Sequence, residues 1–149
     1  MESYTATRFH LEKAGDSSKM KFLANYLVFV HTVAAAECMV LEQKAGLDPE
    51  LILSALQDGA GASRMLELRG GMMTKSDYRG GGGGMFDVFL KDASIITDFA
   101  EGLDIPLDLL TVTRAKLDKA ITQGLDHLDI ASVCKALETE AGIERALAE

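Results

Sequence analysis

The sequence has no tryptophan, only two prolines and only two cysteines in 149 residues. With so few prolines and 6% aromatic residues, aliphatic and small side chains dominate, and this composition favours helices over strands. Cys38 and Cys134 stand alone in separate apolar stretches, which argues against a disulfide framework and against a cysteine-based metal motif. Both are predicted to be buried thiols in a reducing compartment.

Positive charge is also scarce. The 15 lysines and arginines are outnumbered by 23 aspartates and glutamates, which gives a net charge of −8 and a pI near 4.9. No basic stripe is present to neutralise phosphates, so nucleic-acid binding is not expected, and the scattered cations argue against binding to a membrane surface. Residues 1–13 contain no apolar signal region, and we expect a cytoplasmic protein.

Two features that often mark ligand sites are interpreted here as structural. His10, His31 and His127 lie far apart without metal-ligand spacing, so no metal is expected. The run from Arg79 to Gly84 is rich in glycine, but a P-loop would also need a preceding strand and a Lys-Ser/Thr pair, and neither is found there. This run is predicted to be a flexible loop.

Residues 15–46 predict one long helix around which the rest of the chain is organised. Side-chain oxygens at positions 16–18 can cap its first N–H groups, and Gly46 followed by Leu47 is typical of a Schellman ending. A helix that is apolar nearly all round belongs in the middle of a bundle, while its polar ends and interruptions argue against a membrane span. Its apolar positions include Phe22, Leu23, Tyr26, Leu27, Val30, Val33, Ala34, Cys38, Val40 and Leu41.

Five shorter helices are expected after it, so the predicted fold class is all-α, a bundle of about six helices around one long central helix over residues 15–149. Residues 3–11 carry a weak strand pattern without a partner strand, and 1–14 are interpreted as the remnant of an interdomain strand or linker. The first shorter helix is capped by Asp48 and ended by Asp58-Gly59, and the second is capped by Ser63 and stops at Gly70-Gly71. The third runs from Met85 to Gly102, and the fourth restarts at Asp104-Ile105-Pro106 and ends at Gly124. The last starts at Asp129 or Ser132 and has a charged tail that is expected to fray. Inward positions of the fifth helix are predicted to be Leu109, Leu110, Val112, Leu117 and Ile121.

Lys21 and Asn25 interrupt the apolar pattern near the start of the long helix. They are four residues apart and therefore share a face. One interpretation is a lysine that reaches the surface and an asparagine in a local hydrogen bond. The other is a partly desolvated lysine that acts as general acid/base beside an asparagine that orients a substrate. The residues alone leave both open.

A family resemblance adds to this reading. Gly15-Asp16-Ser17-Ser18-Lys19-Met20-Lys21, with Asn25 four residues later, is similar to the Gly-x-Gly-x-x-x-Lys motif of the β-hydroxyacid dehydrogenases. The phrases AGLDPE at 45–50, GAGASRMLELRG at 59–70 and FLKD at 89–92 continue the match. The chain thus resembles, from about residue 15 to 142, the helical C-terminal domain of this family, which includes 3-hydroxyisobutyrate dehydrogenase and 6-phosphogluconate-dehydrogenase-like enzymes.

The resemblance implies roles for individual residues. Lys21 would be the catalytic general acid/base, Asn25 and Ser18 would bind substrate, and Lys91 would lie near the cofactor with Asp92 as its structural neighbour. Taken without the resemblance, Lys91 and Asp92 are a solvated pair. The chain departs from the family pattern in three places, namely Ser17 for the second motif glycine, Ala24 for a common first asparagine, and Gly84 for a frequent aromatic.

The same resemblance implies an NAD- or NADP-dependent oxidation of a small 3-hydroxy acid. The cofactor would be bound mainly by a Rossmann domain, whose GxGxxG loop does not occur in this sequence. The isolated chain is therefore expected to be inactive, and a homo-oligomer, a dimer or larger, is expected. The alternative is a stand-alone helical dimerisation or partner-binding module without catalysis of its own.

Overall fold

The computed structural model describes residues 15–81 and 85–148, and within these ranges all regular secondary structure is helical, which confirms the predicted all-α class. The short strand predicted at 3–11 and the glycines at 82–84 lie outside the described residues. The helices are α1 (Asp16–Lys44), α2 (Pro49–Gln57), α3 (Arg64–Lys75), α4 (Met85–Glu101), α5 (Asp108–Thr122) and α6 (Val133–Glu140), with 3₁₀ segments η1 (Arg79–Gly81) and η2 (Ile130–Ser132).

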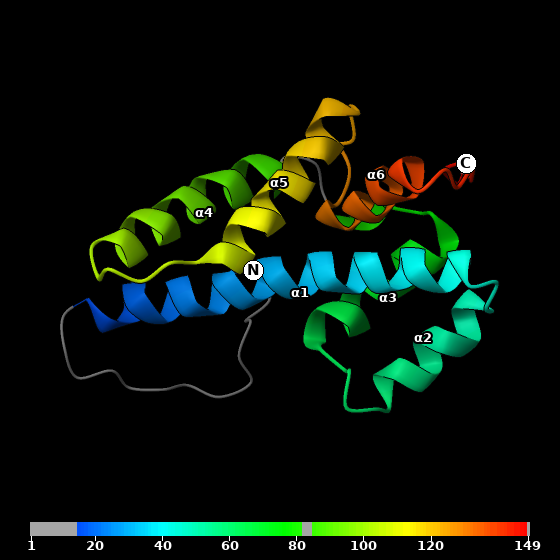
Figure 1. The fold of residues 1–149 in the computed structure, drawn as a ribbon, viewed down its shortest axis with the longest axis horizontal. Coiled ribbons are helices and arrows are strands. Elements are labelled where there is room, and N and C mark those ends of the chain that lie inside the picture. Colours follow the sequence, from blue (N-terminus) through cyan, green and yellow to red (C-terminus); the bar gives the residue numbers. More distant parts are fainter. Residues whose placement is uncertain (1–14, 82–84, 149) are drawn as a thin grey trace.

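α1 is the central element, and the other five helices contact it. In Figure 1, α4, α5 and α6 lie along one side of α1, α2 lies on the other, and α3 crosses behind α1. The buried side chains of α1 fall on the stripe that faces these neighbours, as expected for helical spacing. They are Phe29, Thr32, Val33, Ala35, Ala36, Met39 and Glu42.

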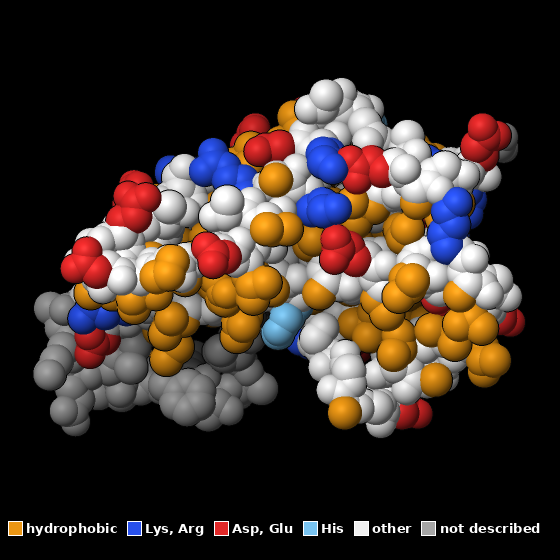
Figure 2. Space-filling model, viewed as in Figure 1, with side chains coloured by type: hydrophobic (Ala, Val, Ile, Leu, Met, Phe, Trp, Pro, Cys, Tyr) orange, Lys and Arg blue, Asp and Glu red, His pale blue; other side chains and the backbone are white. Residues whose placement is uncertain are grey.

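The prediction that α1 is buried all round is wrong at several leucines. Leu23 is 60% exposed, Leu27 49% and Leu41 70%, because the neighbouring helices cover one stripe of α1 and leave the opposite face open. Figure 2 shows apolar side chains gathered on the surface of this view. By length and composition α1 could cross a membrane, with a mean hydropathy of 1.5 over its most apolar stretch, but buried core helices of soluble proteins meet the same criterion.

Several predicted helix ends are confirmed. Gly46 has φ +73°, and the bonds from the N–H groups of Gly46 and Leu47 to the carbonyls of Gln43 and Glu42 form the Schellman ending of α1. The carboxylate of Asp48 caps α2, and the hydroxyl of Ser63 caps α3. These short-range signals determine local geometry, so they are readable from the sequence.

Other predicted boundaries are wrong. No side chain caps α1, because Gly15, with φ +91°, takes the N-cap position. α3 does not stop at Gly70-Gly71 but continues to Lys75. A glycine inside a helix costs only about 1 kcal/mol, and Gly70 lets α3 approach α2 closely, since a Cβ there would meet the side chain of Leu53.

Side-chain burial also departs from the prediction. On α5, Leu110 and Leu117 are buried as expected, but Leu109 and Val112 are exposed, and Thr113 and Ala120 take inward positions instead. Cys134 is buried as predicted, whereas Cys38 is only half-buried. α6 ends at Glu140, and the residues after it pack against α3 rather than fraying.

Glu42 is a buried acid within this core. Its side chain is 4% exposed, and neither carboxylate oxygen has a hydrogen-bond partner among the described residues. Burial raises the pKa of Glu42, the Arg145 guanidinium partly opposes this rise, and the Asp48 carboxylate adds to it. The folded protein therefore holds the proton of Glu42 more tightly than the unfolded chain does.

We expect the contribution of Glu42 to the free energy of unfolding to be fully present below the pKa of an unfolded glutamate, about 4.3, and to be lost as the pH rises through the raised pKa. Glu42→Gln removes this ionisation. Thermal unfolding near pH 8 should then show a higher melting temperature than the parent, with a much smaller gain near pH 4. The exposed Glu101→Gln is the control, and equal differences at both pH values would contradict the assignment.

Candidate functional site

The candidate site lies on the seam between α1 and α4. The ring of Phe22 packs at a tilt against that of Phe99, with centroids 5.3 Å apart, and the Phe29 and Phe89 rings are likewise tilted, with centroids 4.4 Å apart. The pairs run in opposite order along the two helices, so α1 and α4 are antiparallel, as Figure 1 also shows. These aromatic contacts fix the polar residues that stand between them.

Between the two aromatic pairs, one carboxylate oxygen joins α1 to α4. Asn25 Nδ2 donates a hydrogen bond of 2.7 Å to Asp92 Oδ2. Lys21 Nζ lies 3.5 Å from the same oxygen. The side chain of Lys21 is 63% exposed and that of Asp92 is 15% exposed, so the carboxylate is anchored in the seam while the ammonium reaches into solvent.

The structure thus brings together two of the four predicted site residues, Lys21 and Asn25. Ser18 is exposed in the first turn of α1, three residues before Lys21 and seven before Asn25, which places it on the same side of the helix. Lys91 is exposed on α4 and makes no ion pair or hydrogen bond with the described residues. It neighbours Asp92 in sequence but does not join the Lys21–Asn25–Asp92 cluster.

Two expectations about this cluster need correction. Asp92 is not in a solvated pair with Lys91, because its carboxylate is committed to Asn25 and Lys21 on another helix. The desolvation of Lys21 that a general base was expected to need is not supplied by the described residues, since most of its side chain is exposed. Asp92 was the residue that sequence reasoning missed, because no local pattern shows that α4 lies against the start of α1.

The structure also has a cleft, which lies away from the Lys21–Asn25–Asp92 cluster. This cleft of about 240 Å³ is bounded by α1 on one side and by α2 and the start of α3 on the other, and it shares no residue with the Lys21 cluster. Its lining is mostly small and apolar and includes His31, Cys38 and Ser63. Within the described ranges, no group of three or more His, Cys, Asp or Glu side chains is placed to hold a metal ion.

The geometry of the cluster restricts what it can do chemically. A carboxylate accepts and does not donate, so the Asn25 amide must direct its nitrogen at Asp92 and keep its oxygen available as an acceptor. The adjacent Lys21 ammonium carries transferable protons at an open surface. Such a pair can bind a hydroxyl or carbonyl group and exchange a proton with it.

Comparison with known proteins gives a consistent picture. Residues 15–137 match the family described as NAD-binding of NADP-dependent 3-hydroxyisobutyrate dehydrogenase. L-Threonate dehydrogenases are similar to this chain, with 31% identity for that of Haemophilus influenzae and 33% for that of Cupriavidus necator, over 83% and 81% of the chain. The 2-hydroxy-3-oxopropionate reductase of Escherichia coli is 28% identical over 85% of the chain and 43% of its own length.

The fold has a solved counterpart. A crystal structure of 3-hydroxyisobutyrate dehydrogenase from Salmonella typhimurium matches with a TM-score of 0.77 and 30% identity, over 83% of this chain and 43% of that one. The chain spans about 40% of the length of the two L-threonate dehydrogenases. This coverage is consistent with a match to one helical domain of these relatives.

Double-mutant cycles should show that Asp92 serves its two partners differently. The coupling energy between Asn25→Ala and Asp92→Ala is expected to be about 1.5–3 kcal/mol, as for a hydrogen bond to a charged group. The coupling between Lys21→Ala and Asp92→Ala should stay below about 1 kcal/mol, because the ammonium is largely exposed. Chemical denaturation of the single and double variants measures both, and equal couplings would contradict this geometry.

Proposed function

The chain belongs to the NADP-dependent 3-hydroxyisobutyrate dehydrogenase family, and from this premise we propose that it forms the helical, substrate-side part of an NAD(P)-dependent dehydrogenase of small hydroxy acids. The observation that carries the proposal is the exposed Lys21–Asn25–Asp92 cluster. Its lysine and asparagine stand on one helix face within the residues that match the family. We place the reaction in the cytoplasm.

In this proposal Lys21 is the catalytic general acid/base. Its amine takes the proton of the substrate hydroxyl during oxidation, and its ammonium returns a proton to the carbonyl oxygen during reduction. Asp92 is a positioning residue, because it touches Lys21 and Asn25 rather than the reacting atoms. By holding the Asn25 nitrogen, it directs the amide oxygen toward a substrate hydroxyl.

Among the described residues, Lys91 is the one that we propose contacts the dinucleotide cofactor. Lys91 is an exposed cation without an ion pair among them, so it is free to meet a polar or anionic group of NAD or NADP. The nicotinamide of the bound cofactor supplies the hydride acceptor of the oxidation. Ser18, exposed on the face of Lys21, would add a hydroxyl for the substrate.

Exposed apolar side chains favour a second candidate function, a helical module that assembles with another copy of itself. Leu23 and Leu27 of α1 and Leu109 and Val112 of α5 are exposed. Exposed apolar surface of this kind commonly marks association sites. This role is compatible with the first, since a substrate domain can also join subunits.

Lys21→Ala should lower kcat in the enzyme that unites this segment with a nucleotide-binding domain. The expected loss is about 10²–10⁴-fold, with the affinity for NAD(P) nearly unchanged. Lys19→Ala is the matched control, because Lys19 lies on the same helix and, among the described residues, forms an ion pair only with the half-buried Asp16. Turnover at the parent rate in Lys21→Ala would remove Lys21 from the mechanism.

The 149-residue chain alone is expected to show no dehydrogenase activity, because most of the cofactor contacts would come from the other domain. Titration calorimetry with NAD and with NADP tests this directly. Tight binding of NAD or NADP by the isolated chain would contradict the proposal that the other domain makes most of the cofactor contacts.

Light scattering of the isolated chain should give the mass of a dimer or a larger oligomer. Leu27→Glu places a charge on the exposed apolar face of α1 and should shift the mass toward the monomer, because burying an unpaired charge is costly. Thr111→Glu, at an exposed position of α5, is the control. A parent chain that is monomeric at every concentration would rule out the assembly role.

A further inference from the structure

The segment after α6, residues 141–148, doubles back over the end of α3, and we call it the C-terminal strap. Gly142, with φ +67°, turns the chain, and the N–H groups of Gly142 and Ile143 bond to the carbonyls of Thr139 and Glu138 at 3.1 and 2.8 Å. Near the end of the strap, the N–H of Ala148 donates to the carbonyl of Ser76 at 3.0 Å. The tail that was expected to fray is therefore held at two places.

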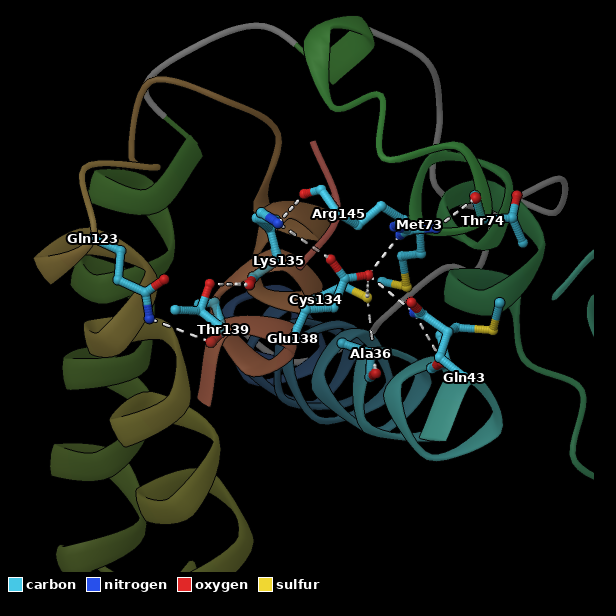
Figure 3. Close-up of polar contacts among 12 residues, drawn as sticks. Ala36, Gln43, Met73, Thr74, Gln123, Cys134, Lys135, Glu138, Thr139 and Arg145 are labelled. Atoms are coloured by element: carbon cyan, nitrogen blue, oxygen red, sulfur yellow. Dashed lines mark hydrogen bonds and ion pairs between the residues drawn. The ribbon is translucent and has the colours of Figure 1, made fainter. Parts of the chain in front are cut away.

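Arg145, in the middle of the strap, is its main attachment to the bundle. Its Nη1 donates to the carbonyl of Thr74 at 2.7 Å, and its Nη2 donates to the carbonyl of Met73 at 2.5 Å (Figure 3). These carbonyls belong to the last turn of α3, where helical partners run out and a positive charge is favourable. Arg145 thus caps a helix from a distant part of the sequence.

The same guanidinium also neutralises a fully buried acid. Nη2 of Arg145 lies 2.6 Å from Oε1 of Glu138, whose side chain is 0% exposed. Gln43 of α1 donates to the same oxygen at 2.9 Å, and Lys135 Nζ is 3.7 Å from the other oxygen. A buried carboxylate that loses its cation is strongly destabilising, so Glu138 holds the strap closed.

Cys134 lies one helical turn before Glu138 on α6, and Oε1 of Glu138 contacts both the Cys134 thiol and Arg145. Its Sγ is 3.9 Å from Glu138 Oε1 and 3.9 Å from the carbonyl of Ala36, and the residue is fully buried (Figure 3). Burial raises the pKa of the Cys134 thiol to about 12, and the Glu138 carboxylate adds to the rise. A thiol in this setting is inert for as long as the groups around it stay packed.

We propose that the C-terminal strap is a latch, which Arg145 holds closed on Glu138, and that its release as a unit exposes the Cys134 thiol while the helical bundle stays folded. All strap residues, Arg145 included, are exposed or only half-buried, and the hydrogen bonds and ion pair of the Arg145 guanidinium provide much of the attachment. Segments with few buried contacts open locally at a lower free energy than the core.

The first test uses the unaltered 149-residue chain. Hydrogen exchange by NMR should show the Ala148 amide protected relative to a free peptide, yet exchanging at least about 100-fold faster than the Ala36 amide in the core. The opening constant obtained from Ala148 should agree with that obtained from alkylation of Cys134. Exchange of Ala148 at the core rate, or at the rate of an unprotected peptide, would overturn the proposal.

The second test changes the latch itself, in a Cys38→Ala background so that only Cys134 is labelled. Arg145→Ala should speed alkylation of Cys134 by iodoacetamide at least about 10-fold while the protein still unfolds cooperatively. Arg64→Ala, which breaks an exposed ion pair with Glu67, is the control and should leave the rate unchanged.

Should Arg145→Ala fail to fold, Glu138→Gln with Arg145→Ala removes the unpaired buried charge along with the latch and should fold with Cys134 equally reactive. Labelling no faster than in the parent chain would show that the strap does not gate the thiol. Labelling that only follows the rate of global unfolding would show that the strap has no opening of its own.

Discussion

The packing of the described chain depends on one wall of side chains along α1, from Phe29 to Met39. Phe29, Ala36 and Met39 are essentially inaccessible, and the other five helices meet this helix. The other helices pack on two sides of these buried side chains, and together they leave part of the α1 surface uncovered. That division explains why a helix that is apolar nearly all round keeps Leu23, Leu27 and Leu41 at the surface.

The position of the candidate site follows from the same constraint. The first turns of α1 meet α4 through two aromatic pairs, and the polar residues between those pairs are held in a narrow register. The carboxylate of Asp92 is therefore held by the packing of two helices, while the charged end of Lys21 is open to solvent.

How far the sequence could predict this structure depended on the range of the interaction. Local signals were readable, because the Asp48 and Ser63 caps and the Schellman turn at Gly46 involve neighbouring residues. The extent of α3 was not, because tertiary contact outweighed the helix-breaking tendency of Gly70-Gly71. Lys21 and Asn25 could be selected from their spacing and from the family resemblance. The partnership with Asp92 could not, since it joins residues 67 positions apart.

Two amide groups of α1 make the same kind of contact near its opposite ends, and their surroundings give them different roles. Asn25 donates to Asp92 of α4, and Gln43 donates to Glu138 of α6. The cation of the first pair, Lys21, is mostly exposed, so it can leave the carboxylate at little cost in free energy. The cation of the second pair, Arg145, is enclosed by backbone carbonyls, so its departure leaves a buried charge. The exposure of the cation, rather than the identity of the acid, therefore decides how much free energy it costs to separate each pair.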